Sequence, residues 1–408
     1  IDPDDPAQDL PIGVNPSMFA FERALTTRAV TAWNDVARVN LVRAPSGAIG
    51  DIAFGAAEFR FPDIFGFGFF PGSLGNLNRQ GDVWINASSP VQNGAELGNT
   101  GWATYLHELG HALGLRHPDE DPNNYDGDPN NNNQYTVMSY IEHPGQANLP
   151  YPDTAWPITP MIFDIQAIQA LYGPNLSTRA GANTYFGPAV PGTARAYALA
   201  DGGLLSSGWN AILTVWDAGG IDTLSAANQT RAVTLNLTPG AFSTIGPIAN
   251  NIGMSAAVTA GGRVVNLIEN ALGGAAGDRL TGNSAANILD GGRGSDILRG
   301  GTGNDTYRVD RTTDQAIENA GGGTDAIRST VRFTLGPNIE TLVLLGPTLR
   351  GTGNGIANGV FGNDAGNTLR GLAGNDRVYG RGGDDDLSGG TGADRFYFDT
   401  ALSASTNI

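Results

Sequence analysis

Three of the four histidines in this 408-residue chain fall within one stretch, HELGHALGLRH, from His107 to His117. His107 and His111 are four residues apart, so on a helix both imidazoles face the same way. Gly114 allows a sharp turn that returns His117 as a third nitrogen ligand. Three neutral nitrogens with one open position suit a catalytic zinc ion, which lowers the pKa of its bound water. Glu108 is placed to accept the proton of that water as it attacks a carbonyl.

The short pattern H-E-x-x-H has a competing interpretation as a helix with buried core histidines, because short patterns arise by chance. The extended pattern H-E-x-x-H-x-x-G-x-x-H is far rarer and is the metzincin signature of zinc peptidases. The zinc interpretation is therefore favoured. His143, the remaining histidine, precedes Pro144 and is interpreted as an ordinary surface residue.

The elements that position these residues form an α+β domain in the first half of the chain. Apolar and small residues at helical spacing predict helices over 22–39, 103–114 and 160–173. Short β-rich runs predict strands over 51–55 and 82–86, and the Asn- and Pro-rich run 121–134 predicts a loop. The last helix is expected to bury one stripe, made of Met161, Ile165, Ile168 and Tyr172.

After about residue 175 the helical periodicity ends and a period of nine appears, in the blocks 273–308 and 353–397. The pattern G-G-x-G-x-[DN]-x-apolar-x predicts a glycine turn followed by a short strand, so two repeats form one coil of a parallel β-roll. The expected inward column is Leu280, Ile288, Ile297, Tyr307, Leu369, Val378, Leu387 and Tyr397. The alternative, a disordered glycine-rich linker, requires no such phase. The segment 310–352 between the blocks has no assignment.

The turns place carboxylates and carbonyls in rows, because residues 18 apart lie one above the other in this architecture. Stacked carboxylates repel unless a cation lies between them, and oxygen-only ligation is typical of Ca²⁺. Asn at some positions is expected to weaken those sites. The predicted calcium ligands of the repeats are Asp278, Asn287, Gly292, Gly294, Asp296, Gly301, Gly303, Asp305, Asn367, Asp376, Asp385 and Asp394.

Bulk composition excludes several function classes. The formal net charge of −17 argues against nucleic acid or acidic membrane surfaces as partners. No run of about 18 apolar residues is present to span a bilayer. The chain has no cysteine, so stability must come from the core or from metals. The acidic start of the sequence shows no cleavable signal peptide.

Several stretches together resemble the serralysin family, secreted bacterial zinc endopeptidases joined to a calcium-binding β-roll. They are LHELGHALGLRHP, QYTVMSY, DIQAIQALYG, WDAGGIDTLSA (216–226), IENALGG (268–274) and the nonapeptides. The resemblance implies His107, His111, His117 and Tyr140 as zinc ligands and Glu108 as the general base. Met138, which alone would more often be core filler, fits the methionine turn beneath the zinc. The Tyr140 phenol can also swing away to hydrogen-bond the oxyanion.

The resemblance also implies calcium ligands outside the nonapeptides, at Asp217, Gly219, Asp222 and Glu269. The loop with Arg179, Gly181 and Asn183 resembles the family's carbonyl-donating loop, although the usual Asp-Thr pair reads Ala182-Asn183 here. Family members usually carry a strand and more before the first helix and a C-terminal continuation with a secretion signal. Neither is visible in this sequence, so these ends are expected either to have been removed or to lie outside it.

The sequence therefore predicts a zinc endopeptidase domain over 1–175 and a calcium-binding β-roll over 176–408. Expected cofactors are one catalytic Zn²⁺ and several structural Ca²⁺. The chain is expected to be secreted without a signal peptide, to be monomeric and to act on proteins or peptides. Substrate is expected along the strand at 82–90, and a proteinaceous protease inhibitor is a further candidate partner. The alternative is a calcium-dependent secreted binding or adhesion protein with an inactive protease-like domain.

Overall fold

The computed structural model divides the chain into two compact units, called here the helical unit and the roll unit. The helical unit comprises residues 1–180, 203–218 and 247–266, and the roll unit comprises 181–202, 219–246 and 267–408. The structure describes residues 13–15, 20–42, 52–59, 64–71, 81–89, 95–120, 128–148, 155–200, 203–206, 210–347 and 350–398.

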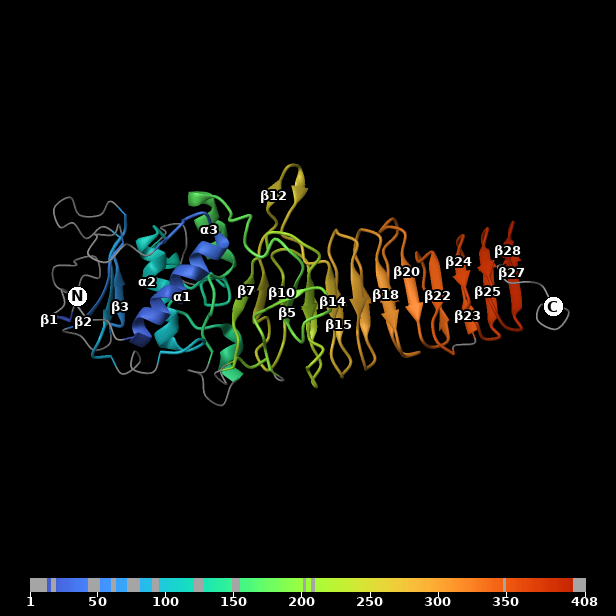
Figure 1. Cartoon of the computed structure of the whole chain (residues 1–408), viewed down its shortest axis with the longest axis horizontal. Coiled ribbons are helices and arrows are strands. Elements are labelled where there is room, and N and C mark those ends of the chain that lie inside the picture. The colour runs from blue at the N-terminus through green and yellow to red at the C-terminus, as the bar shows by residue number, and fades with distance from the viewer. Residues whose placement is uncertain are drawn as a thin grey trace. The chain divides into compact units, whose positions relative to one another are not determined.

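The helical unit, as far as it is described, combines three α-helices with a small mixed sheet (Figure 1). The helices are α1 (Ala20–Val36), α2 (Thr100–Ala112) and α3 (Ile162–Tyr172). The sheet has the order β1 (Gly13–Asn15), β2 (Phe54–Glu58), β4 (Val83–Asn86), β3 (Gly66–Gly68). Short 3₁₀ helices lie at Pro118–Glu120 and Pro144–Asn148. Two further pairs are β7 (Leu213–Val215) with β11 (Ile252–Met254) and β12 (Thr259–Ala260) with β13 (Arg263–Val264).

The predicted helices and strands of this unit are confirmed, with ends displaced by a few residues. The stripe of α3 needs one correction: Met161, Ile165 and Ile168 are buried, but Tyr172 is 39% exposed. Its hydroxyl donates to the Leu113 carbonyl at the end of α2 instead of entering the core. Of the expected loop 121–134, residues 121–127 lie outside the described residues, and 128–134 contain no helix or strand.

The expectation that the strand at 82–90 offers a free edge is wrong. β4 pairs in parallel with β2 and antiparallel with β3, so both of its edges are occupied. Within the described sheet the terminal strand next to α2 is β3, which the sequence did not reveal because its residues are GFG.

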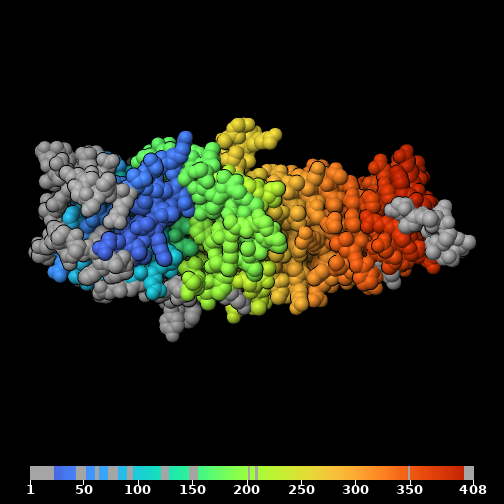
Figure 2. Space-filling model, in the orientation of Figure 1, coloured from blue at the N-terminus to red at the C-terminus, as the bar shows by residue number. Residues whose placement is uncertain are grey.

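The roll unit is a parallel β-roll in which short strands stack along the chain (Figure 1). Figure 2 shows the surface of the same chain, with the residues of the roll in green through red. One layer is a single sheet: β28 (Arg395–Tyr397), β26 (Arg377–Tyr379), β24 (Gly359–Phe361), β22 (Thr341–Leu344), β20 (Ala326–Ser329), β18 (Thr306–Val309), β16 (Ile288–Asp290), β14 (Asn270–Leu272), β8 (Thr223–Ser225), β5 (Asn183–Phe186) and β6 (Ala194–Ala196). The other layer is two sheets: β19 (Gln315–Ile317), β17 (Ile297–Arg299), β15 (Arg279–Thr281), β9 (Thr234–Asn236); and β21 (Phe333–Thr334), β23 (Arg350–Thr352), β25 (Thr368–Ala373), β27 (Asp386–Thr391). The two-residue strand β10 (Phe242–Ser243) follows β9 in the chain.

Register within the repeats confirms that two nonapeptides make one coil. Arg279 pairs with Ile297, and Ile288 pairs with Thr306, both 18 residues apart. The glycines of the turns have the positive φ that the pattern requires, +74° at Gly292 and +138° at Gly294. An L residue at such a position would be strained, which is why the turn repeats glycine.

The predicted inward column is wrong at three positions. Leu289 and Leu298 are fully buried, whereas Ile288 is 39% exposed and Ile297 is only partly buried. Tyr397 also points outward, where its ring stacks on Tyr379 with centroids 4.2 Å apart. Successive residues of a strand face opposite sides, so an assignment shifted by one residue exchanges interior and surface.

Segment 310–352 continues the roll instead of leaving it. β19 to β23 all belong to the two layers, but the spacing changes: Thr306 pairs with Ala326 and Ala326 with Thr341, offsets of 20 and 15 residues. The second layer is interrupted here, between β19 and β21. The irregular spacing hides these strands from a search for nine-residue periods.

Replacement of one interior leucine tests the corrected column. Leu289→Ala is expected to lower the free energy of unfolding of the roll by about 2–5 kcal/mol, because it leaves a cavity in a packed interior. The neighbouring Ile288→Ala is the matched control and should cost under about 1 kcal/mol. Urea unfolding in excess calcium, followed by circular dichroism, measures both. A larger loss for the control would contradict the assignment.

Candidate metal-binding active site

Three histidines of the helical unit bring their ring nitrogens together. The Nε2 atom of His117 lies 3.0 Å from Nε2 of His107 and 2.9 Å from Nε2 of His111. His107 and His111 are 8% and 6% exposed. The three residues therefore form a half-open cluster in which one ligand atom from each lies within 4.8 Å of the others.

The other ring nitrogen of each histidine has an oxygen partner. Nδ1 of His107 lies 2.9 Å from the Val137 carbonyl, and Nδ1 of His111 lies 2.8 Å from the Leu115 carbonyl. Nδ1 of His117 lies 2.7 Å from a carboxylate oxygen of Glu120. Carbonyl and carboxylate oxygens only accept hydrogen bonds, so each Nδ1 carries the proton and each Nε2 presents a lone pair.

Three lone pairs that face each other repel unless a positive charge lies among them. Protonation is disfavoured: burial, followed by the neighbouring His111, lowers the pKa of His107 to about 3. Burial and the neighbouring His117 lower the pKa of His111 to about 4. Three neutral imidazole nitrogens are a donor set that fits zinc.

The ends of α2 explain how the chain positions these ligands. Asn99 caps the helix by accepting the Trp102 amide hydrogen at 3.0 Å. At the other end the Leu115 amide donates to the Gly110 carbonyl and Gly114 adopts φ +101°, which closes the helix as a Schellman motif. This reversal returns the chain so that His117 lies opposite the face that carries His107.

Strand β3 packs so tightly on α2 that two of its residues must be glycine. A methyl group on Gly68 would lie 2.1 Å from the Glu108 carbonyl oxygen, and one on Gly66 would lie 2.8 Å from Glu108 Cγ. Glu108 is only 7% exposed. Burial raises the pKa of the Glu108 carboxyl to about 8, partly opposed by a hydrogen bond from the Gly68 backbone.

The turn that carries Met138 lies against the same helix. Met138 is 2% exposed, and a methyl group on Gly110 would lie 2.6 Å from its sulfur. Tyr140, two residues on, is 70% exposed. Its ring centroid lies 4.5 Å from that of His117 and 5.4 Å from that of His107. The structure thus brings Tyr140 to the histidines from the solvent side.

Asp164 of α3 was not singled out by sequence reasoning, yet it holds this turn. Its carboxylate accepts hydrogen bonds from the Thr136 hydroxyl at 2.6 Å and from the Val137 and Met161 amides at 2.8 Å. The Val137 carbonyl is the partner of His107 Nδ1. Val137 therefore connects Asp164 to the histidine cluster, because its amide donates to Asp164 and its carbonyl oxygen is the partner of His107. Burial raises the pKa of this carboxyl to about 6, opposed by these three hydrogen bonds.

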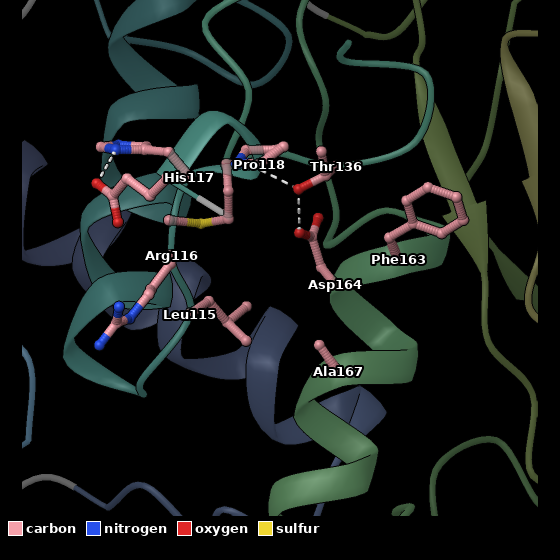
Figure 3. A pocket seen from close by; sticks show the side chains of 10 residues that line it. Leu115, Arg116, His117, Pro118, Thr136, Phe163, Asp164 and Ala167 are labelled. Atoms are coloured by element: carbon pink, nitrogen blue, oxygen red, sulfur yellow. Dashed lines mark hydrogen bonds and ion pairs between the residues drawn. The ribbon is translucent and has the colours of Figure 1, made fainter. Parts of the chain in front are cut away.

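A pocket of about 530 Å³ opens beside His117 (Figure 3). The segment after α2, the turn before Met138 and the first turns of α3 enclose it. Its lining residues are Leu115, Arg116, His117, Pro118, Glu120, Thr136, Met138, Phe163, Asp164 and Ala167. Its position next to a cluster of ligand atoms makes it a candidate site for part of a substrate.

With this geometry in hand, comparison with known proteins identifies the family. The family model described as peptidase M10 serralysin C terminal matches residues 174–407, more than half of the chain.

The chain belongs to the serralysin family.

Relatives of this serralysin-family chain include named metallopeptidases. It is 33% identical over 278 residues to metallopeptidase AprA of Pseudomonas marginalis, covering 65% of this chain and 54% of that protein. It is 32% identical over 275 residues to a serralysin of Photorhabdus luminescens, covering 64% and 52%. Serralysin C of Dickeya chrysanthemi is 36% identical over 224 residues, covering 52% and 42%. The matches thus span about half the length of these relatives.

The fourth histidine of this serralysin-family chain is not a surface residue, contrary to expectation. His143 is 2% exposed and lies in a loop where its Nδ1 accepts the Gly145 amide hydrogen at 2.9 Å. Its Nε2 lies 3.2 Å from the Asn250 carbonyl. His143 therefore fixes the local backbone and is not part of the three-histidine cluster.

In the roll, each predicted carboxylate is tied to the coil before it. One oxygen of Asp296 accepts the Asp278 amide hydrogen at 2.8 Å, and one oxygen of Asp394 accepts that of Asp376 at 3.0 Å. The same bond joins Asp305 to Asn287 and Asp385 to Asn367. The stacked rows predicted from the 18-residue spacing are therefore present in the structure.

Asp and Asn differ in the hydrogen bonding of the second polar atom of the side chain, which is a carboxylate oxygen in Asp and an amide nitrogen in Asn. The second carboxylate oxygens of Asp305 and Asp376 are buried with no hydrogen-bond partner. The Asn287 amide nitrogen instead donates to the Glu269 carbonyl at 2.9 Å. Asn287 thus satisfies its own position, whereas Asp305 and Asp376 each leave an oxygen available for a cation. The turn glycines Gly301 and Gly303 have φ of +107° and +117°, as the turn requires.

Of the predicted calcium ligands outside the nonapeptides, five belong to the roll unit: Gly181, Asn183, Gly219, Asp222 and Glu269. Asp222 accepts the Asn183 amide hydrogen at 2.6 Å, and its own amide donates to Glu269 at 2.8 Å. Gly220 adopts φ +151°, and a methyl group there would lie 2.7 Å from the Gly181 carbonyl oxygen. Burial and the Asp222 charge raise the pKa of Glu269 to about 7, opposed by the Asp222 amide. Gly219, the neighbour of Gly220, has φ +128°.

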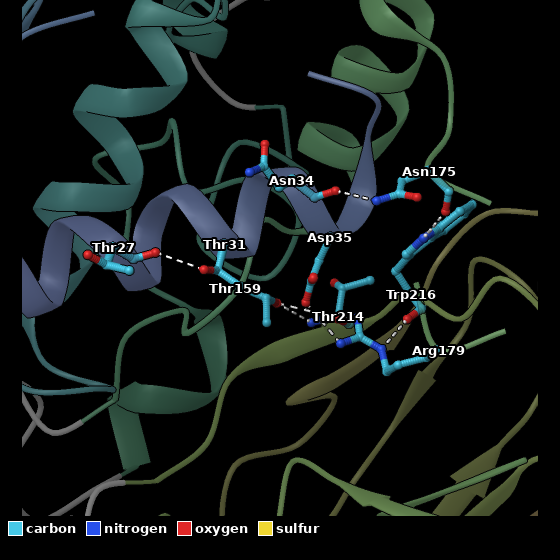
Figure 4. Close-up of polar contacts among 9 residues, drawn as sticks. All are labelled: Thr27, Thr31, Asn34, Asp35, Thr159, Asn175, Arg179, Thr214 and Trp216. Carbon is cyan, nitrogen blue, oxygen red and sulfur yellow. Dashed lines mark hydrogen bonds and ion pairs between the residues drawn. The ribbon is translucent and has the colours of Figure 1, made fainter. Parts of the chain in front are cut away.

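The other two, Arg179 and Asp217, belong to the helical unit. The Arg179 guanidinium donates to the Trp216 carbonyl and to Asp35 of α1, both at 3.0 Å (Figure 4). Asp217 is 1% exposed. The Arg179 side chain thus fastens its loop to α1, and only its backbone oxygen remains as the donor that the resemblance implies.

The histidine–carboxylate pair predicts the effect of one conservative change. Glu120→Gln keeps an acceptor for His117 Nδ1 but removes its negative charge, so zinc affinity is expected to fall about tenfold. Asp119→Asn, an exposed neighbour in the same 3₁₀ helix, is the matched control. Competition with a fluorescent zinc chelator measures both variants. Equal affinities for the two would show that Glu120 does not support the metal site.

Proposed function

We propose that this chain is a zinc-dependent endopeptidase in which Glu108 is the general base. The observation that carries the proposal is the convergence of three histidine lone pairs beside a buried glutamate on the same helix. The relatives named as metallopeptidases and serralysins support it. A zinc ion held by the three histidines would polarise a peptide carbonyl and acidify a bound water.

The environment of Glu108 is that of a general base whose ionised form would be stabilised by a nearby cation. Without one, burial raises the pKa of its carboxyl to about 8. A positive charge close to the carboxylate favours the ionised form and lowers the pKa again. Glu108 would then accept the proton of the attacking water and pass it to the leaving nitrogen.

Tyr140 is proposed as an additional zinc ligand and as a donor to the oxyanion. Its ring rests beside His117 while 70% of the residue stays exposed, so the phenol can move without disturbing the core. A hydroxyl aimed at the developing negative charge would stabilise the transition state more than the ground state.

The substrate is proposed to be an extended peptide that lies along β3. This strand is terminal in the described sheet and contacts Glu108 through Gly66 and Gly68. Backbone pairing with such an edge gives broad sequence preference. The pocket beside His117 would receive one substrate side chain, bordered by Arg116 and Phe163.

Replacing Glu108 by its isosteric amide tests the mechanism. Glu108→Gln cannot accept the proton of the water, so peptidase activity is expected to fall about 10²–10⁴-fold while zinc remains bound. Glu142→Gln, at a partly buried site outside the cluster, should leave turnover unchanged and serves as the control. Activity on casein and zinc content are measured on the same samples. A zinc-loaded Glu108→Gln protein with full activity would refute the role.

We further propose that the rows of the roll unit bind several Ca²⁺ ions and that this binding folds the roll in an extracellular, calcium-rich medium. Aspartates with an unpartnered oxygen, such as Asp305 and Asp376, are the strongest candidates. Their buried charge opposes folding in the absence of a cation, so the free energy of binding becomes free energy of folding. Secretion follows as part of this proposal. No helix within the described residues has the length and apolar character to cross a bilayer.

The carboxyl pKa values predict how the roll responds to pH without calcium. Burial raises the pKa of Asp296 from 3.8 to about 6 and that of Asp305 from 3.8 to about 7. A group with a raised folded pKa stabilises the fold below its unfolded pKa, and that stability is lost as the pH rises through the folded value. In chelator, the thermal midpoint of the roll should therefore decrease as the pH is raised from about 4 to about 7.

The measurement is thermal circular dichroism of the full chain at several pH values, with chelator and with calcium. Calcium should remove most of the pH dependence near neutrality. The double variant Asp296→Asn with Asp305→Asn should flatten the dependence in chelator, whereas the exposed Asp386→Asn should not. A roll whose stability in chelator rises over this range would contradict the proposal.

A further inference from the structure

Arg116 and Phe70 form a contact beside the histidine cluster that the proposed mechanism does not use. The guanidinium carbon of Arg116 lies 5.7 Å from the centroid of the Phe70 ring, which is within the range of a cation–π contact. The Phe70 ring in turn stands edge-on to His111, with ring centroids 5.2 Å apart and an interplanar angle of 69°. The contact therefore holds a positive charge one aromatic ring away from the cluster.

The position of Phe70 follows from the two-residue period of a strand. Gly66 and Gly68 face α2, since a methyl group on Gly66 would lie 2.8 Å from Glu108 Cγ and one on Gly68 would lie 2.7 Å from His111 Cβ. Phe70 lies two residues further along the same extended chain, and its ring also reaches His111. A peptide laid along β3 would therefore pass this ring within a few residues of the bond that is cleaved.

The Arg116 side chain is exposed and has no acidic partner among the described residues. The ion pairs found there belong to His117 and to two other arginines. Glu120, the acid one helical turn further on, is engaged by Nδ1 of His117 at 2.7 Å. Arg116 borders the pocket beside His117, but in Figure 3 its guanidinium points away from Asp164 on the other wall. The N–H donors of the guanidinium are thus free to meet a ligand outside that pocket.

The chemistry of this group matches a carboxylate. A guanidinium presents its N–H donors in a planar fork that fits two carboxylate oxygens, and an aromatic surface beneath it reduces the conformational freedom lost on binding. The whole chain, with a formal net charge of −17, repels acidic peptides at long range. A fixed cation beside the cluster would offset this repulsion at one place only.

We propose that Arg116, held in place by Phe70, selects substrates with an acidic side chain at one position near the scissile bond. This inference rests on the proposed peptidase function and adds a class of substrate to it. The carboxylate of a substrate glutamate or aspartate would accept hydrogen bonds from the guanidinium. A different side chain of the same peptide would enter the pocket beside His117.

Pairs of peptides that differ only by glutamate or glutamine at one position test this selectivity. The position is moved stepwise along both sides of the cleaved bond, and kcat/KM is measured with the chain loaded with zinc and calcium. At one position the glutamate peptide should be favoured about three- to tenfold, as expected for a partly exposed charged pair. The preference should weaken as salt is added, because salt screens exposed charges.

Three variants assign the preference to this side chain. Arg116→Gln should bring the ratio of the two kcat/KM values to about one. Arg116→Lys, which keeps the charge but loses the planar fork, should retain only part of the preference. Arg28→Gln, at an exposed arginine of α1, is the matched control and should keep the wild-type ratio.

Binding without turnover separates this inference from the proposed function. Fluorescence anisotropy with the Glu108→Gln chain should show tighter binding of the glutamate peptide than of its glutamine partner. A wild-type chain that binds the glutamate peptide more tightly but hydrolyses neither peptide would sink the peptidase proposal and leave the role of Arg116 standing. Equal binding and equal kcat/KM for the two peptides at every position, or a preference that persists in Arg116→Gln, would overturn the role of Arg116.

Discussion

Buried electron-pair donors that face one another are tolerable only with a positive charge between them, and this constraint governs both units of the chain. In the helical unit the donors are three imidazole nitrogens about 3 Å apart. In the roll unit they are aspartate oxygens left without partners at the turns. The chain has 23 basic and 40 acidic residues, a formal net charge of −17. On the proposed function, bound metal ions would supply the positive charge at these places.

The two kinds of site differ in how firmly the protein itself prepares them. The histidine cluster is held by oxygen partners on every Nδ1 atom, and Asp164 fixes the turn that supplies one of them. These hydrogen bonds orient the three rings in the absence of an ion, as the proposed catalytic zinc site would require. The rows of the roll rest on strands that are mostly three or four residues long, joined by glycine turns. Ordering these strands and turns costs more conformational entropy, so the calcium ions proposed above would contribute more to folding there.

The sequence was most informative where the relevant contacts are local. Histidine spacing on one helix and Gly114 after it bring three ligands together within eleven residues, so the cluster could be predicted directly. The contribution of Asp164 could not, because it depends on α3 meeting a turn 27 and 28 residues earlier in the chain, at Val137 and Thr136. β3 was missed because GFG carries no strand pattern, although its glycines are what lets it approach Glu108.

The errors in the roll have equally simple causes. Ile288 and Ile297 are apolar neighbours of the true interior residues, and a shift by one residue reverses the face of a strand. Segment 310–352 keeps the architecture while changing the spacing, so periodicity alone could not reveal its strands. The buried acids Glu318 and Asp325 escaped for the same reason, because they lie 13 and 20 residues after Asp305 and not at multiples of nine.

The most direct test of the account is whether peptide hydrolysis requires one zinc ion at the histidine cluster. The calcium-loaded chain would be assayed on casein before and after removal of zinc with 1,10-phenanthroline, and again after stoichiometric zinc is returned. Activity is expected to disappear with the zinc and to be restored by about one equivalent per chain, while the calcium content stays constant. Casein hydrolysis that continues without zinc, or its absence from a chain carrying one zinc at His107, His111 and His117, would contradict it.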